Sequence, residues 1–319
     1  MQVSTRTVWQ VSGGPTNRSY ADVFLKHGVA LIGPGDPGRW RPERGDDEFE
    51  GSFVRRFASE AKTGDIVLLR IGQSKVRAIG LIADDYAYLP QFDDVNGWDL
   101  QHGRRVRWFE LPQDYDFGSP VFGANPPRFS KLATSEVLDY AHRFVTSPPT
   151  HWQTAPLPGL PDPEPSLVEI PDSLRDLVAQ VQDLAGLYWN RAEFGDHPTE
   201  DELIAHYVVP FLRTLGWPVE QIAIKWRAID VTVFRSLPRS PSSCHYILEA
   251  KRLGQGIEGA LAQAQGYLQA IGVQRDIVVT DGIRYRMYQA DKEFSPAAYA
   301  NLGNLKHSAL ELFARMKQP

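Results

Sequence analysis

Residues 229–234, IDVTVF, and residues 246–252, YILEAKR, decide the fold of this 319-residue chain. Both runs are rich in β-branched and aromatic residues, which predicts two strands joined by a loop. Residues i and i+2 of a strand share a face, so Glu249 and Lys251 project together while Ala250 points away. Asp230 begins the neighbouring strand. Because charged side chains at a buried strand end are rarely placed there for packing alone, this strand pair predicts a functional site.

Asp230, Glu249 and Lys251 together favour one kind of chemistry. Two carboxylates converging from adjacent strands form an oxygen-rich site suited to Mg²⁺. A lysine beside them can orient water and stabilise developing negative charge. The arrangement is therefore typical of metal-assisted phosphodiester hydrolysis. A bare Glu-x-Lys pair is otherwise a strand-end ion pair, and the upstream aspartate is what favours a site over that alternative.

Two helices predicted on either side of these strands supply further candidates. Gln263 and Tyr267 share one helix face at spacing i, i+4 and could position a phosphate or the lysine; a buried tyrosine with a satisfied hydroxyl is the alternative. In the upstream helix, Thr199 and Glu202 form a capping box. Glu200 lies on the apolar stripe of that helix, so it is the candidate third metal ligand; an interaction with the helix dipole is its alternative role.

The combination resembles the PD-(D/E)XK nuclease superfamily, with Ile229 where that family often has proline. Gln263-x-x-x-Tyr267 resembles the QxxxY motif of the nuclease domain in type I restriction R subunits. The segments VVPFLRTLGW and DIVVTDGIRYRMY resemble the same group, and the match covers roughly residues 197–290. The resemblance implies a metal-dependent endonuclease with Asp230 and Glu249 as metal ligands. No G-x-x-x-x-G-K-[ST] motif occurs, so neither ATP nor an attached motor is expected.

The N-terminal part has a different pattern, with many strand-like runs and few helices, which predicts a small curved β-barrel. The predicted strands are TVWQVS, GVALIG, DIVLLRIG, VRAIGLIADDYAYL and RRVRWFEL, with a helix over residues 50–65 that ends at Gly64. Trp40 and Trp98 lie in turn-forming contexts where a core tryptophan is not expected. They could stack on bases or fill the rim of the barrel. Arg104, Arg105 and Arg107 form a stripe that could follow phosphates or simply be a solvated edge.

The order of the strand TVWQVS, the hairpin KTGDIVLLRIGQSKVRAIGLI and the later segment WDLQH-RRVRW resembles the EVE/YTH-like branch of the PUA superfamily. The match spans about residues 5–112. It implies a domain that holds a flipped, often modified base in an aromatic-lined pocket. Trp40 and Trp98 are the implied stacking residues, and Ser12 and Asp84 are the implied readers of the base edge.

Composition sets the outer limits of these interpretations. The net charge is −5, with 18 Lys+Arg against 19 Asp+Glu in residues 1–150 and, by subtraction from 34 and 39, 16 against 20 in the remainder. Any DNA binding must therefore depend on local patches. One cysteine excludes a disulfide framework. The chain has no signal-peptide pattern and no apolar run long enough to span a membrane, so a cytoplasmic protein is expected.

Eight of the 24 prolines fall between Pro148 and Pro171, which predicts a semi-rigid linker. We expect an EVE/PUA-like modified-base recognition domain over residues 1–147, a proline-rich linker over 148–171 and a PD-(D/E)XK endonuclease domain over 172–319. The expected fold class is α+β and α/β: a small PUA-like β-barrel with helices, then a mixed sheet flanked by helices.

These inferences together predict a type IV-like restriction enzyme of phage defence, which recognises DNA carrying a modified base, with modified cytosine favoured, and cuts the backbone. Mg²⁺ is the expected cofactor, with Mn²⁺ able to substitute, and double-stranded modified DNA is the expected partner. One site cuts one strand, so a homodimer on DNA is expected. Two alternatives stay open: a nuclease for RNA or structured DNA, and a non-catalytic nucleic-acid-binding protein.

Overall fold

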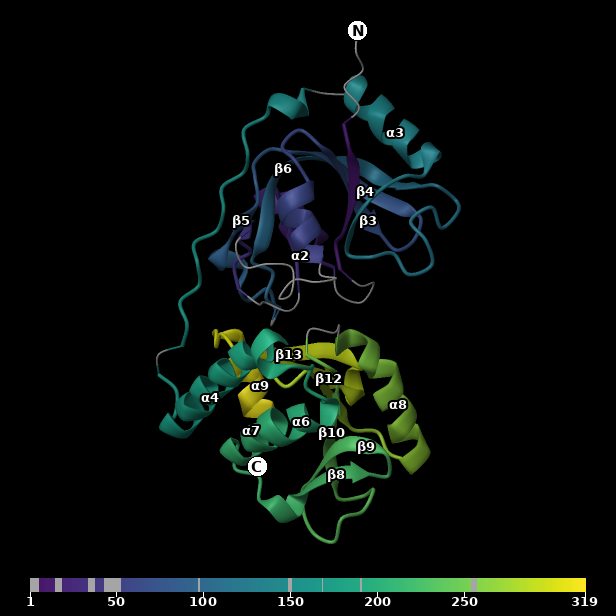
Figure 1. The fold of residues 1–319 in the computed structure, drawn as a ribbon. Helices are drawn as coiled ribbons and strands as arrows, with labels where there is room; N and C mark the ends of the chain where they lie inside the picture. The colour runs from purple at the N-terminus through teal and green to yellow at the C-terminus, as the bar shows by residue number, and fades with distance from the viewer. Residues whose placement is uncertain are drawn as a thin grey trace. The chain divides into compact units, whose positions relative to one another are not determined.

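The computed structural model describes residues 6–14, 19–33, 38–42, 53–96, 98–148, 151–167, 169–189, 191–253 and 257–319. It is a mixed α/β protein that divides into two compact units (Figure 1). The first unit comprises Met1–Gly33, Gly38–Phe92 and Leu100–Pro163; the second comprises Pro34–Pro37, Asp93–Asp99 and Glu164–Pro319. Within the proline-rich stretch the division falls between Pro163 and Glu164.

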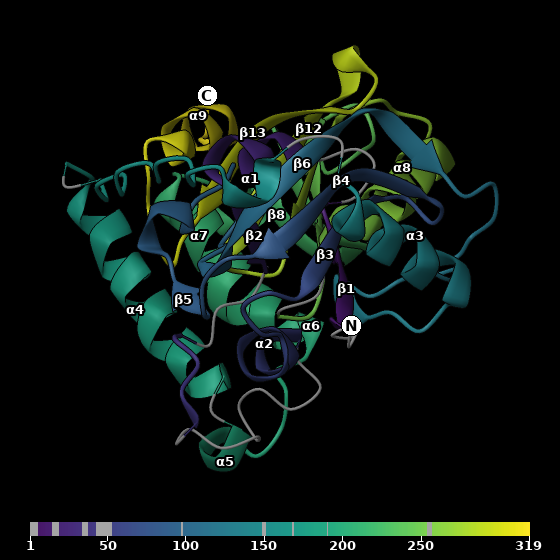
Figure 2. The same ribbon diagram turned by 90° about the horizontal axis from the view of Figure 1, so that it is seen from above.

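The first unit is built on one curled sheet with the order β2-β6-β4-β3-β1-β7, and β5 pairs with β6. Figure 2 shows β6, β4, β3 and β1 following one another in this order. The strands are β1 (Val8–Ser12), β2 (Val29–Ile32), β3 (Ile66–Ile71), β4 (Lys75–Ile82), β5 (Ala87–Tyr88), β6 (His102–Asp116) and β7 (Phe129–Lys131). β1 and β3 are parallel, and the other pairs are antiparallel. All five predicted strand segments therefore contain a strand.

This sheet is a curled half-barrel, whereas the sequence predicted a closed one. Its order begins at β2 and ends at β7, and the described residues contain no pairing between these two edges. Helix α3 (Ser135–Thr146), which the sequence analysis did not predict, packs on this sheet. Val137, Ala141 and Val145 of α3 pack into the same core as Ile66 and Leu68 of the sheet. One apolar face of the sheet is thus covered by a helix.

The first two helices of the first unit are short. Helix α1 (Ala21–His27) ends at Gly28, which adopts the left-handed conformation typical of a C-terminal glycine cap. The helix predicted over residues 50–65 begins within the described residues as α2 (Phe53–Arg55) and continues as a π-helical turn, Arg56–Glu60. It ends at Ala61, because that residue is already extended. The prediction that Gly64 ends this helix is therefore wrong.

The second unit is a six-stranded mixed sheet with the order β13-β12-β11-β10-β9-β8. β10 and β11 are parallel, and the remaining pairs are antiparallel. Its strands are β8 (Ile222–Trp226), β9 (Ile229–Phe234), β10 (Cys244–Ala250), β11 (Asp276–Thr280), β12 (Arg284–Gln289) and β13 (Ser295–Asn301). Its helices are α4 (Asp172–Trp189), α5 (Arg191–Phe194), α6 (Glu200–Leu203), α7 (Val209–Thr214), α8 (Ala260–Ile271) and α9 (Ser308–Met316).

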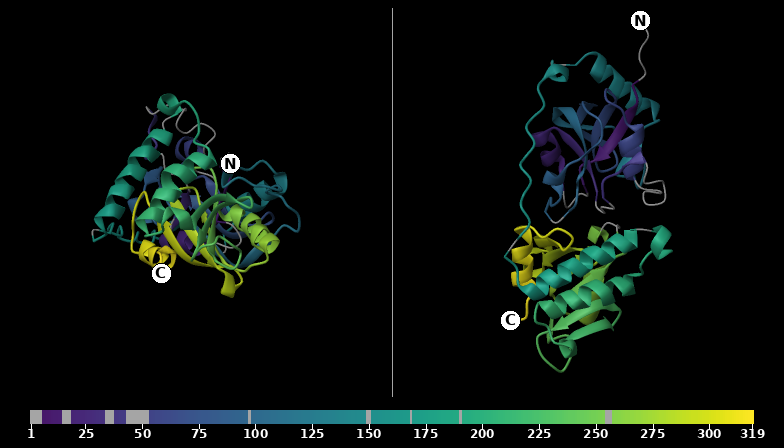
Figure 3. Two further views of the ribbon diagram at one scale, coloured as in Figure 1. Left: turned by 90° about the horizontal axis from the view of Figure 1, so that it is seen from below. Right: turned by 60° about the vertical axis from the view of Figure 1, so that its left-hand side comes forward.

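Helices cover both faces of this sheet, as the sequence predicted. One core contains Tyr246 and Leu248 of β10 with side chains of α4, α6, α7 and α9; the other contains Ile247 with side chains of α8. This alternation follows from the two-residue period of a strand. The right-hand view of Figure 3 shows the helices of the first group layered on the sheet. β13 and α9 were not predicted from the sequence.

A π-helical turn, Ile204–Val208, separates α6 from α7 inside the single helix that the sequence predicted. It ends two residues before Pro210, whose missing N–H and bulky ring disturb the regular hydrogen-bond ladder of an α-helix.

The proline-rich stretch is packed at both of its ends. Arg107 Nε donates to the carbonyl of Ala155 at 3.0 Å within the first unit. The backbone N–H of Leu167 donates to the carbonyl of Leu305 at 2.9 Å within the second. Among the described helices, none is long and apolar enough to cross a membrane.

Candidate metal and phosphate site of the second unit

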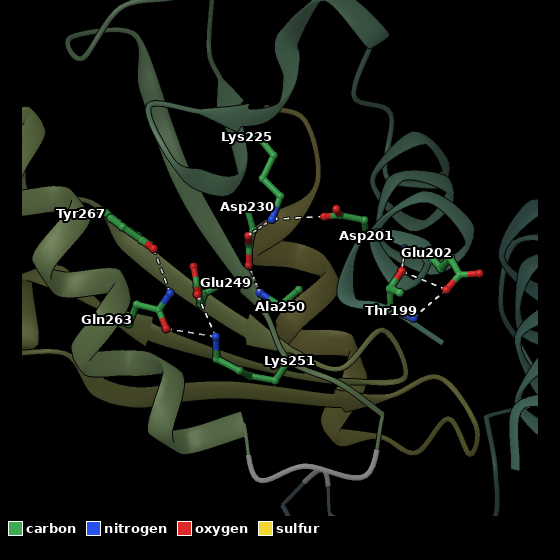
Figure 4. Close-up of polar contacts among 10 residues, drawn as sticks. All are labelled: Thr199, Asp201, Glu202, Lys225, Asp230, Glu249, Ala250, Lys251, Gln263 and Tyr267. Atoms are coloured by element: carbon green, nitrogen blue, oxygen red, sulfur yellow. Dashed lines mark hydrogen bonds and ion pairs between the residues drawn. The ribbon is translucent and has the colours of Figure 1, made fainter. Parts of the chain in front are cut away.

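The antiparallel pairing of β9 and β10 brings the two predicted carboxylates together. Val231 lies opposite Leu248, so Asp230 and Glu249 follow at the same end of the ladder. Asp230 is buried, and its Oδ2 accepts a hydrogen bond of 2.8 Å from the backbone N–H of Ala250 (Figure 4). This bond fixes the orientation of the carboxylate without using a second side chain.

Glu249 is almost fully buried at 1% exposure, and only one of its oxygens is hydrogen-bonded. Oε1 accepts 2.9 Å from Lys251 Nζ, whereas Oε2 has no hydrogen-bond partner among the described residues. Burial raises the pKa of Glu249; the bond from Lys251 lowers it in part, and the charges of Asp230 and Glu200 raise it further. An unpartnered buried carboxylate oxygen is costly unless a ligand completes it, so this atom is a suitable cation ligand.

Lys251 belongs to a short chain of polar side chains that reaches helix α8. Its Nζ donates to Gln263 Oε1 at 3.1 Å, and Gln263 Nε2 donates to the hydroxyl of Tyr267 at 2.8 Å. Figure 4 shows Gln263 and Tyr267 projecting from successive turns of α8 toward the ends of β9 and β10. The structure thus brings together all five residues that the sequence placed in the catalytic set: Asp230, Glu249, Lys251, Gln263 and Tyr267.

The residues present fit a divalent cation that keeps part of its water shell. Asp230 and Glu249 provide hard carboxylate oxygens, and Glu249 Oε2 awaits a partner. Within the described ranges, no three His, Cys, Asp or Glu side chains are grouped closely enough to enclose a metal by themselves. Mg²⁺ usually binds through one or two carboxylates and completes its octahedron with water and substrate oxygens. The donor set therefore suits Mg²⁺ better than a cation that needs a full protein cage.

Three acidic side chains lie at the start of α6. Glu202 forms the capping box with Thr199, as the sequence predicted. The backbone N–H of Thr199 donates to Glu202 Oε2 at 2.6 Å, and the backbone N–H of Glu202 donates to Thr199 Oγ1 at 3.1 Å. These backbone and side-chain bonds lower the pKa of Glu202. Glu200 is close enough to act on the pKa of Glu249, but it does not complete a three-carboxylate cluster in the described residues. Its role as a third ligand stays a prediction.

Lys225 is the site residue that the sequence analysis missed. Its Nζ lies 2.7 Å from Asp230 Oδ1 and 3.2 Å from Asp201 Oδ1 (Figure 4). Hydrogen bonds to these carboxylates raise the pKa of Lys225, against a smaller opposing effect of burial. Its sequence neighbourhood, IKWRAID, does not indicate this contact. The contact forms because the tight turn between β8 and β9 places Lys225 beside Asp230.

The predicted base-binding residues lie in different surroundings. Trp40 is half-buried in the first unit, with its ring edge-on to Tyr86 at 6.1 Å, and its backbone N–H donates to the Tyr86 hydroxyl. That hydroxyl also lies 2.8 Å from His102 Nδ1, and the Tyr86 ring stacks on His102. Trp98 is buried, and its segment, Asp93–Asp99, belongs to the second unit.

The two predicted edge readers, Ser12 and Asp84, differ in exposure. Ser12 is half-buried, and its hydroxyl forms a local turn with Gly14. Asp84 is exposed, and its backbone carbonyl accepts from Arg104 at 3.2 Å. Their role in reading a base stays a prediction, as do those of Trp40 and Trp98.

The three predicted arginines of β6 all donate hydrogen bonds to backbone carbonyls of the chain. Arg104 is buried, and its guanidinium donates to the carbonyls of Phe57, Ala58 and Asp84. The Arg104 side chain is thus enclosed by backbone acceptors, and its predicted phosphate contact stays a prediction. Arg105 and Arg107 lie on the other strand face, where they donate to carbonyls of Pro158 and Ala155. Both are more exposed than Arg104.

Comparisons with known proteins give one family model and a distant structural similarity. A family model described as a domain of unknown function, DUF8426, matches residues 9–120. A fragment structure assigned to the HsdR subunit of a type I restriction enzyme from Vibrio vulnificus YJ016 is similar at 16% identity and a TM-score of 0.26. It covers 37% of this chain, and this chain spans 25% of it. No curated protein matches.

Proposed function

We propose that this chain is a modification-dependent DNA endonuclease of the type IV-like restriction class. One observation carries the proposal: Asp230, Glu249 and Lys251 converge at a strand end, with a buried Glu249 oxygen that no described residue satisfies. The Gln263–Tyr267 pair adjoining Lys251 supports it. In this proposal the second unit is a PD-(D/E)XK-like nuclease, and the first unit is an EVE/PUA-like reader.

Each residue of the site has a distinct proposed role. Asp230 and Glu249 hold the cation, with Glu200 as a candidate third ligand. Lys251 Nζ donates its third N–H to the attacking water, and Gln263 keeps that ammonium in place from 3.1 Å. Tyr267 in turn holds the Gln263 amide. Mg²⁺, or Mn²⁺ in its place, would supply Lewis-acid polarisation of the phosphate; the proposal includes no ATP.

The first unit is the proposed reader of the modified base. Trp40 and its neighbours Tyr86 and His102 provide aromatic surface in one place. A flipped base would gain about 1–3 kcal/mol from stacking on such a surface, which offsets the few kcal/mol of extrusion. Ser12 and Asp84 remain proposed base contacts of this unit, whereas the role of Trp98, which is buried and belongs to the second unit, stays a prediction from the sequence. Arg105 and Arg107 remain proposed backbone contacts, for which they would have to exchange carbonyl acceptors for phosphate oxygens.

Digestion of a DNA panel tests the proposal. Duplexes of one sequence carrying different modified cytosines or adenines, or no modification, are incubated with the full chain and Mg²⁺. We expect cleavage of a modified duplex, no cleavage of the unmodified one, and loss of cleavage by at least about a hundredfold in Lys251→Met. A double-strand cut would also require two copies of the chain on the DNA, which analytical ultracentrifugation with uncut duplex can detect.

The controls separate the alternatives. Lys75→Met removes an exposed lysine of the first unit that pairs with Asp116, and it should leave cleavage unchanged. Equal cutting of modified and unmodified duplexes would contradict modification dependence. Preferential cutting of single-stranded RNA or branched DNA would favour a different nuclease. If no substrate is cut and Lys251→Met changes nothing, the chain is a binding protein only.

A further inference from the structure

Lys225 lies directly across the β8–β9 hairpin from Asp230. Ile224 pairs with Val231 and Trp226 pairs with Ile229, so the register places Lys225 opposite the aspartate. Directly opposed residues of an antiparallel pair have neighbouring side chains. The two-residue turn is therefore what brings this ammonium group to the candidate cation site.

Both oxygens of the Asp230 carboxylate accept a hydrogen bond within the protein. Oδ2 accepts from the backbone N–H of Ala250 at 2.8 Å, and Oδ1 accepts from Lys225 Nζ at 2.7 Å. The side chain of Asp230 is 8% exposed, whereas that of Lys225 is 47% exposed. A cation that binds Oδ1 competes with the lysine for that oxygen, because the ammonium group lies against it and carries charge of the same sign.

A second acceptor is already in place for the displaced lysine. Asp201 Oδ1 lies 3.2 Å from the same Nζ, and the Asp201 side chain is 74% exposed. Lys225 can therefore leave Asp230 and keep an ion pair. The loss of one charged contact is then partly offset by the other.

The backbone at this position is unusual as well. Lys225 has φ 54°, and the turn residues Arg227 and Ala228 have φ 52° and 69°. Non-glycine residues rarely adopt this left-handed region, and they concentrate at functional sites and switches. The strain at Lys225 is additional to that of the turn, since the turn itself requires the conformation only at its two central positions.

We propose that Lys225 is a positioning residue that holds Asp230 Oδ1 in the absence of a cation and is displaced onto Asp201 when Mg²⁺ or Mn²⁺ binds. The inference rests on the proposed function, because it assumes that Asp230 is a metal ligand. It gives the site a built-in competitor. The apparent association constant for the cation equals the intrinsic constant multiplied by the fraction of molecules in which Oδ1 is free.

Direct Mn²⁺ binding to the full chain, without DNA, tests this inference. Free Mn²⁺ is measured by electron paramagnetic resonance during titration of the wild type, Lys225→Met, Lys225→Arg and Asp230→Asn. We expect Lys225→Met to bind Mn²⁺ at least about threefold more tightly and Lys225→Arg to stay close to the wild type. A lysine needed only for folding would give the opposite sign, because its loss would weaken the site.

A matched control and a double variant complete the design. Lys75 also lies opposite an aspartate, Asp116, at 3.7 Å, and both side chains are exposed, so Lys75→Met should not change Mn²⁺ binding. Asp201→Asn should weaken binding in the wild type, and that effect should shrink in Lys225→Met if it acts through the lysine.

The outcomes distinguish this inference from the proposed function. Equal affinity of the wild type and Lys225→Met, with binding lost in Asp230→Asn, overturns only the role of Lys225. If Asp230→Asn leaves Mn²⁺ binding unchanged, both in the wild type and when combined with Lys225→Met, the metal site itself is overturned. Tighter binding in Lys225→Met that depends on Asp230 supports both.

Discussion

At the scale of single residues, the polar chain from Lys251 to Gln263 and Tyr267 is the part of the site most open to experiment. Gln263→Ala removes the amide that fixes Lys251 Nζ, and small displacements of a positioned group are costly in rate. We expect kcat for DNA cleavage to fall about tenfold to a hundredfold with KM nearly unchanged. Steady-state kinetics on a modified duplex measures both constants.

Gln269 provides the control for that prediction. It is exposed on the same helix, and Gln269→Ala removes an identical side chain away from Lys251. Its kinetics should match the wild type. Parallel losses in the two variants would mean that helix α8, and not the Gln263 amide, accounts for the effect.

His245 gives the chain a pH dependence of stability. Burial, and then the charge of Arg235, lower its pKa from 6.5 to about 4. The unfolded chain therefore binds a proton that the folded chain does not. Above pH 6.5 His245 is neutral in both states and the free energy of unfolding is at its full value. That free energy decreases as the pH falls from 6.5 toward 4, because only the unfolded chain gains the proton. Between pH 7 and pH 4.5 this one group should cost about 2 kcal/mol of unfolding free energy.

His245→Gln tests this dependence, since glutamine does not titrate and its carbonyl can accept the bond that Arg235 Nε gives His245 Nδ1 at 2.9 Å. The variant should lose less stability than the wild type on acidification, as measured by urea unfolding followed through nearby Trp217. His151→Gln, at an exposed histidine, should follow the wild type. An identical acid profile of all three proteins would refute the assignment.

At the scale of elements, the β8–β9 hairpin is held in a turn that its sequence does not favour. A two-residue turn with positive φ at both positions prefers Asn-Gly, but Arg227 and Ala228 stand here. Ala228→Gly should relieve about 1–2 kcal/mol of left-handed strain, reduced by the entropy of glycine. We expect a gain of about 0.5–1 kcal/mol in unfolding free energy, measured by calorimetry.

Ala298→Gly is the reference substitution for the hairpin. Ala298 is buried in β13, and its backbone is not among those with positive φ. Glycine should destabilise this position by about 0.5–1 kcal/mol. Destabilisation by both substitutions would show that the hairpin turn is not strained.

At the scale of the whole molecule, recognition and cleavage belong to different units in the proposed function, so they should be separable. Trp40→Ala should weaken binding of a modified duplex about tenfold, a loss of ~1–3 kcal/mol of stacking, and leave unmodified duplex unaffected. Lys251→Met should bind the modified duplex normally but not cut it. Fluorescence anisotropy with Ca²⁺ in place of Mg²⁺ measures binding.

Tyr115→Ala is the control for the reader, since Tyr115 is an exposed aromatic of the same unit that packs on Tyr140 and lies outside the Trp40 cluster. The net charge of −5 predicts weak attraction to ordinary DNA. The difference in affinity between modified and unmodified duplexes should therefore depend mainly on stacking by Trp40. Equal weakening of both duplexes in Trp40→Ala would place this residue in general binding and not in recognition.

The sequence by itself determined the parts that depend on local periodicity: the second unit's mixed sheet flanked by helices, the strands of the first, and the grouping of Asp230, Glu249 and Lys251. It also predicted the capping box at Thr199, because spacing along one chain segment sets these features. Only the tertiary structure decided that the first sheet stays a half-barrel covered by α3, that Arg104 is enclosed, and that Lys225 reaches Asp230. Those features depend on which distant segments pack together and on an atypical turn, and neither leaves a periodic signal in the sequence.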